Sequence, residues 1–389
     1  MESFNEFAEQ WNPEICKNNY GSIMIDSSLA DWIELLALSK QSVPWSTIMD
    51  YLKKDQNSLL MYRPFMMGPD LNEWNSEIPK GLDGEGDGEG DDQTDYDEDS
   101  SSSSNASKDD FSHESEDLEE EANRETITLE ERVRNLINTR GQYLTDLYPF
   151  KFKQNVLQLN DDVVLGRNPY ILILCISILK GWENSIYQNY RLSRRQLGQL
   201  NNIVTGAFEF IVDAAFKAVG LKSFVIGTAH RDATFFQRLV KAAEVLGLPK
   251  PLPKEITTSK YSKDGGVDVV SGYIWNDNHK CERLFLVQAA CGQEGEWNHK
   301  LRGVRTSRWA NYFRQKTEPI ALLAVPYQMT DQAIANFLDD RNSETFLDRL
   351  RLVKLFGSAD YDFNFEDEGN EAIKDFKSKC NEYLDIDLS

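Results

Sequence analysis

A long segment with almost no apolar side chains divides this chain into two parts that can fold. Residues 81–125 carry 19 acidic side chains against two basic ones, and most of the rest are Gly and Ser. Such a segment cannot bury enough apolar surface to offset the entropy lost on ordering, and its like charges repel. We therefore expect a disordered acidic linker over 79–125, between an N-terminal helical module over 1–78 and a larger domain over 126–389.

The acidic linker also accounts for most of the net charge of −22. The remaining residues are close to balanced, so the overall acidity does not exclude a polyanionic partner such as nucleic acid. Two interpretations of the linker stay open. It is a soluble spacer, or it mimics DNA and occupies a basic cleft until the substrate displaces it.

Two short apolar runs in the larger domain are typical of neighbouring buried strands. Residues 267–270 and 284–287 are rich in β-branched side chains and are separated by a polar hairpin. Asp268 lies between apolar neighbours in the first run, Gln288 ends the second, and Lys300 follows shortly after. An acid, an amide oxygen and an ammonium group gathered at adjacent strand ends can hold a divalent cation against a phosphate. This arrangement indicates a metal-dependent nuclease.

An amphipathic helix upstream of these strands carries a further acid. Apolar residues recur every three or four positions over 196–219, and Gly220 ends the pattern. Glu209 lies among aromatic and β-branched neighbours, where a carboxylate needs a partner. Two interpretations stay open: Glu209 is a further metal ligand, or it is an acid at the edge of a core-facing helix.

The pattern resembles the PD-(D/E)xK nuclease superfamily, and most closely its Mrr-like restriction endonuclease branch. The segment GGVDVV, which contains Asp268, is similar to the Gly-(Val/Ile)-Asp strand of that branch, and Gln288 matches the Gln of its Gln-x-Lys strand. Ala290 occupies the lysine position of that strand, and the resemblance implies that Lys300 on a neighbouring helix replaces it. The Phe-Glu context of Glu209 is similar to the acid-bearing helix of the same families.

The resemblance implies an α/β chain with a restriction-endonuclease-like core, that is, a mixed central sheet flanked by helices. It implies a DNA endonuclease that uses Mg²⁺ or Mn²⁺, with Asp268, Gln288 and Glu209 as metal ligands and Lys300 as the transition-state cation. Similar bacterial proteins are associated with restriction or phage defence loci. The alternative, which the missing lysine leaves open, is a catalytically inactive nuclease fold that binds DNA or serves as an adaptor subunit in a multi-protein defence complex.

A basic run over 300–316 predicts a nucleic-acid contact. It holds six basic residues and no acidic one, and Arg302, Arg305 and Arg308 fall three apart, as on one side of a helix. Arg231 is a further candidate for a phosphate contact. A solvated helix face that neutralises the acidic linker is the competing interpretation. The same helix would bury the aromatic residues Trp309, Tyr312 and Phe313.

Other patterns describe the surroundings of these residues. The module over 1–78 shows no basic recognition helix, so we expect it to dock a partner protein such as a helicase or another ATPase. The apolar run 170–179 is too short to span a membrane and predicts a buried core helix. A strand is expected at 320–326, and a β-hairpin over 150–165 is expected to turn at 160–161.

Cysteine usage and missing motifs exclude other chemistries. The five cysteines are odd in number and contain no Cys-x-x-Cys pair, which argues against a disulfide scaffold or a zinc finger and indicates a reducing cytoplasm. We interpret Cys291 as a small packing residue rather than a nucleophile. The sequence has no P-loop and no Gly-x-Ser-x-Gly elbow. Its acidic, polar start predicts no signal peptide, and we expect a cytoplasmic protein with no membrane contact.

Overall fold

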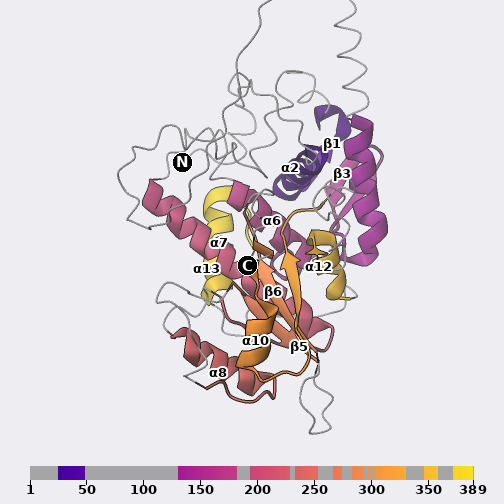
Figure 1. The fold of residues 1–389 in the computed structure, drawn as a ribbon. Coiled ribbons are helices and arrows are strands. Elements are labelled where there is room, and N and C mark those ends of the chain that lie inside the picture. Colours follow the sequence, from indigo (N-terminus) through magenta and orange to yellow (C-terminus); the bar gives the residue numbers. More distant parts are fainter. Residues whose placement is uncertain are drawn as a thin grey trace, which may run out of the picture.

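The computed structural model shows a mixed α/β fold with two sheets (Figure 1). The residues that it describes are 25–48, 130–181, 193–227, 233–252, 266–273, 283–292, 297, 300–301, 303–329, 346–357 and 371–388. None of the helices in these ranges is long and apolar enough to cross a membrane.

Five strands form the larger sheet, in the order β4-β5-β6-β7-β8. Its first three strands, β4 (Lys222–Val225), β5 (Val269–Gly272) and β6 (Leu284–Ala289), are antiparallel neighbours. β7 (Ile320–Ala324) runs parallel to β6, and β8 (Phe346–Leu347) runs parallel to β7. The three strands expected from the sequence are confirmed, with small shifts in their limits.

Both faces of this sheet are covered. Val269 belongs to the main hydrophobic core, whereas its neighbour Val270 belongs to a second apolar cluster, because successive side chains of a strand point to opposite faces. α7 (Arg194–Ala218) packs on the first face, and α8 (Phe235–Val245) and α10 (Thr306–Tyr312) supply the second cluster. Burial on both faces explains why the strand sequences are almost continuously apolar.

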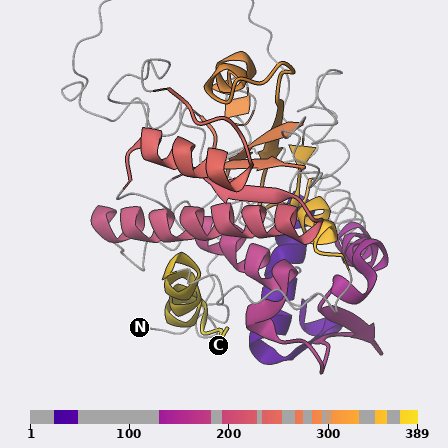
Figure 2. The same ribbon diagram turned by 90° about the horizontal axis from the view of Figure 1, so that it is seen from below.

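α7 is the helix that links the sheet to the rest of the fold. It begins at a capping box, in which the Ser193 side chain accepts from the Gln196 N–H and the Gln196 side chain accepts from the Ser193 N–H. It ends just before Gly220, whose φ of 80° favours glycine. Away from the sheet it packs against α6 (Pro169–Gly181) and α13 (Glu371–Leu384), as Figure 2 shows for α13. The expected amphipathic and buried helices are confirmed.

The smaller sheet has the strand order β1-β3-β2. β1 (Ser42–Pro44) and β2 (Phe150–Lys153) both pair antiparallel with β3 (Val156–Leu159). The chain turns between β2 and β3 at Gln154 and Asn155, whose φ angles of 50° and 62° suit a tight hairpin turn. The turn expected from the sequence lay later in the chain and is wrong, because the segment interpreted as one strand contains the turn.

α2 (Ile25–Lys40) shares its hydrophobic core with the larger domain. Its buried residues Trp32 and Leu36 belong to the same apolar cluster as residues of α6, α7 and β6. Directly after β1, the indole N–H of Trp45 donates to the carboxylate of Glu130, which begins a helix over 130–144. The limits expected for the N-terminal module and the acidic linker lie outside the described residues and stay predictions.

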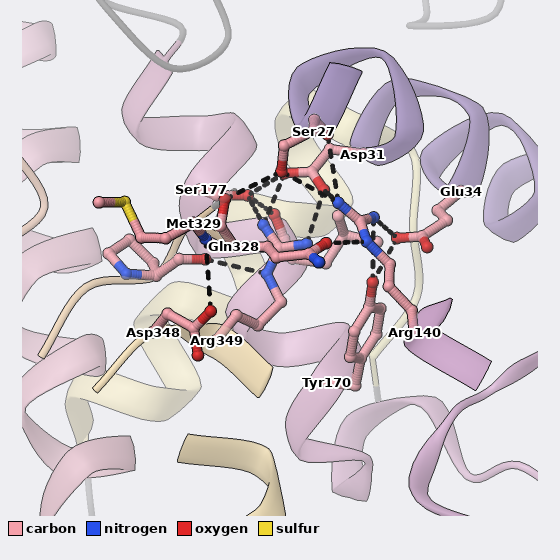
Figure 3. Close-up of polar contacts among 12 residues, drawn as sticks. Ser27, Asp31, Glu34, Arg140, Tyr170, Ser177, Gln328, Met329, Asp348 and Arg349 are labelled. Atoms are coloured by element: carbon pink, nitrogen blue, oxygen red, sulfur yellow. Dashed lines mark hydrogen bonds and ion pairs between the residues drawn. The ribbon is translucent and has the colours of Figure 1, made fainter. Parts of the chain in front are cut away.

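Buried ion pairs reinforce the docking of α2 (Figure 3). Asp31 of α2 receives two hydrogen bonds, of 2.7 and 2.6 Å, from Arg349 at the start of α12 (Arg349–Leu355). Arg140, from the helix over 130–144, pairs with Asp31 and with Glu34 at 2.8 Å each. All four side chains are at most 1 % exposed. Two acids are thus matched by two guanidinium groups, so that no buried charge is left uncompensated.

Two phenols complete this buried network. Tyr148 and Tyr170 each donate a hydrogen bond of 2.6 Å to the carboxylate of Glu34. Burial, together with the negative charge of Glu34, raises the pKa of both phenols well above their ordinary value, so they stay protonated. Burial opposes the ionisation of Asp31, but Arg349 and Arg140 outweigh it and hold the pKa of this carboxyl below its ordinary value.

Candidate active site

Glu209 lies in the middle of α7 and is fully buried. Its carboxylate contacts Gly227, the second residue after the end of β4. A β-carbon at Gly227 would lie 2.5 Å from Oε2 of Glu209 and 2.6 Å from its Cδ. Position 227 therefore has to be glycine for this carboxylate to keep its place.

Asp268 lies immediately before β5 and is held by hydrogen bonds of its backbone and its side chain. Its carbonyl accepts the N–H groups of Ile226 and Gly227 at 2.7 and 3.0 Å, and its own N–H donates to Val287 at 2.9 Å. The Oδ2 atom of its carboxylate accepts the N–H of Ala289 at 2.8 Å. Gly227 thus contacts the Glu209 carboxylate on one side and the Asp268 backbone on the other, which brings the two acids together.

Gln288 lies between the two residues of β6 that Asp268 bonds. The register of β5 and β6 ends at the pair Val269 and Val287, and just beyond it Asp268 donates its N–H to the carbonyl of Val287 and accepts the N–H of Ala289. The Oε1 atom of Gln288 is buried and has no hydrogen-bond partner among the described residues. A buried acceptor without a donor is costly, and a bound cation is one way to satisfy it.

These three side chains suit a hard divalent cation. Asp268 and Glu209 offer carboxylate oxygens and Gln288 offers a neutral amide oxygen, the ligand types that Mg²⁺ prefers. In the described part of the chain, no group of three or more His, Cys, Asp or Glu side chains could hold a metal ion. A cation at this place would therefore depend on the amide oxygen in addition to the two carboxylates.

Two hydrogen bonds fix the residues directly after β6, which precede Lys300 in the chain. The buried Trp297 donates from its indole N–H to the carbonyl of Gly292 at 3.0 Å and stacks on Tyr327. The Tyr327 hydroxyl donates in turn to the carbonyl of Cys291 at 2.7 Å. Lys300 is half-buried and lies three positions after Trp297 in the chain.

The pKa of the Cys291 thiol depends on burial and on four charged side chains. Burial raises its pKa to about 12, the charges of Lys180 and Lys300 act to lower it, and those of Glu209 and Asp268 act to raise it. Three of the four residues selected from the sequence, Glu209, Asp268 and Lys300, are thus close enough for their charges to act on one thiol, and Gln288 lies three positions before that thiol in the chain. The thiol itself is unsuited to nucleophilic attack, because it stays protonated at neutral pH.

Lys180 was missed by sequence analysis. It lies in the last turn of α6, and its ammonium donates to the side chain of Asn201 on α7 at 2.8 Å. The available signal was a single charge in a helix whose other residues are almost all apolar. Nothing in the spacing of residues linked that charge to Glu209 or Asp268.

The basic run is arranged differently from the expectation. α10 begins at Thr306, so Arg305 is its exposed N-cap residue, whereas Arg308 lies within the helix and is half-buried. The expectation that Arg305 and Arg308 share one side of a helix is wrong, because the helix starts after Arg305. Arg302 and Arg231 lie outside the described residues. The aromatic side of the helix is confirmed by the burial of Trp309, Tyr312 and Phe313.

Comparison of the chain with protein family models, curated proteins and solved structures finds no match. The functional assignment therefore depends on the geometry of the site and on the sequence motifs that it contains.

Proposed function

We propose that the protein is a metal-dependent nuclease that hydrolyses phosphodiester bonds of DNA in restriction or phage defence. One observation carries the proposal. Glu209 and Asp268 both contact Gly227, the charges of Glu209, Asp268 and Lys300 all act on the Cys291 thiol, and Gln288 lies between the two residues of β6 that Asp268 bonds. The two acids, the amide and the ammonium group are the residue types that divalent-cation binding and phosphoryl-transfer chemistry require.

In this proposal the chain supplies a preorganised site. Asp268, Glu209 and Gln288 would hold Mg²⁺ or Mn²⁺, which polarises a phosphoryl oxygen and lowers the pKa of a bound water. The N–H of Ala289 fixes the orientation of the Asp268 carboxylate before substrate binds. Lys300 would stabilise the negative charge that develops on the phosphate.

The surroundings of the site support this function. A mixed sheet with helices on both faces is compatible with the restriction-endonuclease-like core that the resemblance implies. Arg305 and Arg308 lie on the segment that follows Lys300, where they would contact the phosphate backbone, and Arg302 and Arg231 are proposed for the same role. A cytoplasmic location and a partner helicase or ATPase bound through 1–78 belong to the same proposal.

The absence of a lysine at position 290, where the resemblance implies one, favours a second candidate function. Ala290 is fully buried, and its N–H donates to the carbonyl of Ala324 at 2.8 Å, so the core encloses this position. In this second candidate the fold has lost catalysis and acts as a DNA-binding or adaptor subunit. Lys300 would then be a DNA contact only.

A cleavage assay on plasmid and linear DNA with Mg²⁺ or Mn²⁺ separates the two candidates. For the nuclease we expect cutting by the wild type that EDTA abolishes, that Asp268→Asn and Glu209→Gln abolish, and that Lys300→Met slows by about 10²–10³-fold. Asp213→Asn is the matched control, because Asp213 is a second buried acid on α7 whose partner is Lys217 at 2.9 Å. DNA binding without cutting in either metal would instead establish the second candidate.

A further inference from the structure

Arg238 is a buried cation that binds the backbone beside the candidate site. It lies near the start of α8 and is 8 % exposed. Its Nη1 atom donates to the carbonyls of both Ile226 and Gly227, at 2.5 Å to the second of them. These two residues directly follow β4. One side chain therefore fixes two consecutive carbonyls, and its charge makes these hydrogen bonds stronger than those of a neutral donor.

The segment formed by Ile226 and Gly227 also contacts both candidate acids. Its two N–H groups donate to the carbonyl of Asp268 at 2.7 and 3.0 Å, and Gly227 contacts the carboxylate of Glu209. The N–H groups of this segment are thus bonded to Asp268, and its carbonyls are bonded to Arg238. Because the segment contacts both acids, a shift of its backbone would change the spacing between Glu209 and Asp268.

A helix cap and aromatic packing hold Arg238 in place. α8 begins at a capping box, in which the Thr234 side chain accepts the Gln237 N–H and the Gln237 side chain accepts the Thr234 N–H. The guanidinium group lies 5.9 Å from the ring centre of Phe235, which packs edge-on against Trp309 of α10. A cation near a helix N-terminus opposes the helix dipole, so the stability of α8 gives no reason for an arginine here.

The spacing of two carboxylates matters more for some cations than for others. Mg²⁺ requires a near-octahedral set of ligands at about 2.0–2.1 Å, whereas Ca²⁺ accepts roughly six to eight oxygen atoms at about 2.3–2.6 Å in flexible geometry. Ligands that are held at a fixed spacing can therefore satisfy Mg²⁺, and ligands that can spread favour Ca²⁺. The relative affinity for the two cations measures how firmly the acids are held.

We propose that Arg238 is a positioning residue of the candidate metal site. Through the backbone of Ile226 and Gly227 it holds Glu209 and Asp268 at the spacing that Mg²⁺ requires. This inference rests on the proposed function. It gives Arg238 a part in cation selectivity that arises from its contacts with the backbone, and not from contact with the cation or with nucleic acid.

The test measures cation binding in the absence of nucleic acid. The full-length protein is titrated calorimetrically with Mg²⁺ and, separately, with Ca²⁺, and the double variant Asp268→Asn/Glu209→Gln gives the background binding of the other acidic residues. We expect Arg238→Gln to weaken Mg²⁺ binding by about 10–100-fold, as the loss of a residue that orients metal ligands does. Binding of Ca²⁺ should weaken clearly less. Arg238→Lys keeps a cationic donor for one carbonyl, so its loss of Mg²⁺ affinity should be intermediate.

Arg351→Gln is the matched control. The Nη1 atom of Arg351 also donates to a backbone carbonyl of the larger sheet, that of Phe346 at 2.8 Å, but it joins α12 to β8 rather than α8 to the site. Thermal melting verifies folding, and Arg238→Lys carries the test if Arg238→Gln does not fold. Failure of both variants to fold would assign Arg238 to folding and overturn the inference.

The outcomes separate this inference from the proposed function. A larger loss of Mg²⁺ than of Ca²⁺ affinity in Arg238→Gln, with Arg351→Gln like the wild type, establishes the positioning role. Unchanged Mg²⁺ affinity, equal losses for the two cations, or the same loss in Arg351→Gln overturns that role and leaves the metal site of the proposed function standing. A wild type that binds both cations no better than Asp268→Asn/Glu209→Gln overturns the metal site and this inference together.

Discussion

Arg349 and Asp31 stand 318 positions apart in the chain and form a two-pronged ion pair, with N···O distances of 2.7 and 2.6 Å. Both side chains are buried. The pair joins α12 to α2, so α2 is held by a residue far along the chain (Figure 3). Removal of Arg349 would leave two buried acids, Asp31 and Glu34, with a single guanidinium group, Arg140, so the buried charges would no longer be balanced.

The first prediction concerns this pair. Arg349→Met should lower the free energy of unfolding by about 3–5 kcal/mol, because Asp31 would lose its closest cation. Urea denaturation measures the change. Arg351→Met is the control on the same helix, since Arg351 is half-buried and bonds the carbonyl of Phe346, and we expect a loss of about 1 kcal/mol there. Equal losses in the two variants would show that charge compensation is not the cause.

The second prediction concerns the close approach at Gly227. Gly227→Ala forces the Glu209 carboxylate to move and should lower the free energy of unfolding by about 1–3 kcal/mol, as overpacking does. In a Glu209→Ala background the same substitution should cost clearly less, and urea denaturation of the four proteins measures this coupling. Gly198→Ala is the control, because nothing lies within 4 Å of its added methyl group, and it should stabilise α7. If Gly227→Ala lowers the free energy of unfolding equally with and without Glu209, the contact between Glu209 and position 227 is contradicted.

The third prediction separates the stability and the function of Gln288. Gln288→Leu removes a buried oxygen that has no hydrogen-bond partner among the described residues, so the free energy of unfolding should stay the same or rise. Metal-dependent DNA cutting should be lost, because a cation ligand is removed. Gln199→Leu, at an exposed position of α7, should leave cutting unchanged. A destabilised Gln288→Leu protein that still cuts DNA would show that the amide has a structural role only.

The fourth prediction concerns the buried thiols. Burial raises the pKa of Cys291 to about 12, and burial together with the neighbouring Cys175 raises that of Cys380 well above its ordinary value. Because the thiolate is the reactive form, iodoacetamide at pH 8 should leave both residues unmodified in the native protein and alkylate them in urea. Peptide mass spectrometry measures each site separately. Alkylation of Cys291 in the native protein would indicate an accessible thiolate and would reopen a nucleophilic role.

Local patterns in the sequence were sufficient for the strand pair at the site. The apolar runs beside Asp268 and Gln288 were sufficient to predict two strands, and the register confirms that these strands are neighbours. The helix that carries Glu209 was predicted in the same way, from a helical period and a Gly at the helix end, whereas Glu209 itself was selected from the resemblance. Such patterns depend on a few consecutive residues, so they can be recognised without knowledge of the fold.

Other features depend on contacts between distant segments and left no local signal. Lys180 contacts Asn201 only because α6 packs on α7, and the buried position of Asp31 depends on Arg349, 318 positions further along the chain. The hairpin turn was misplaced because Gln154 and Asn155 are a less obvious turn pair than the Asn-Asp that follows them. Packing within the fold decided these cases, and local preference alone was insufficient.

The hydrogen bond between Trp45 and Glu130 has a topological consequence. The bond joins residues 85 positions apart, so the two described segments that flank residues 49–129 in the sequence meet at one place. α2 is retained by its own apolar side chains and by the buried charges, whether or not the backbone between is continuous. Two separate polypeptides, one ending after β1 and the other starting before Glu130, should therefore complement each other and assemble into the same fold.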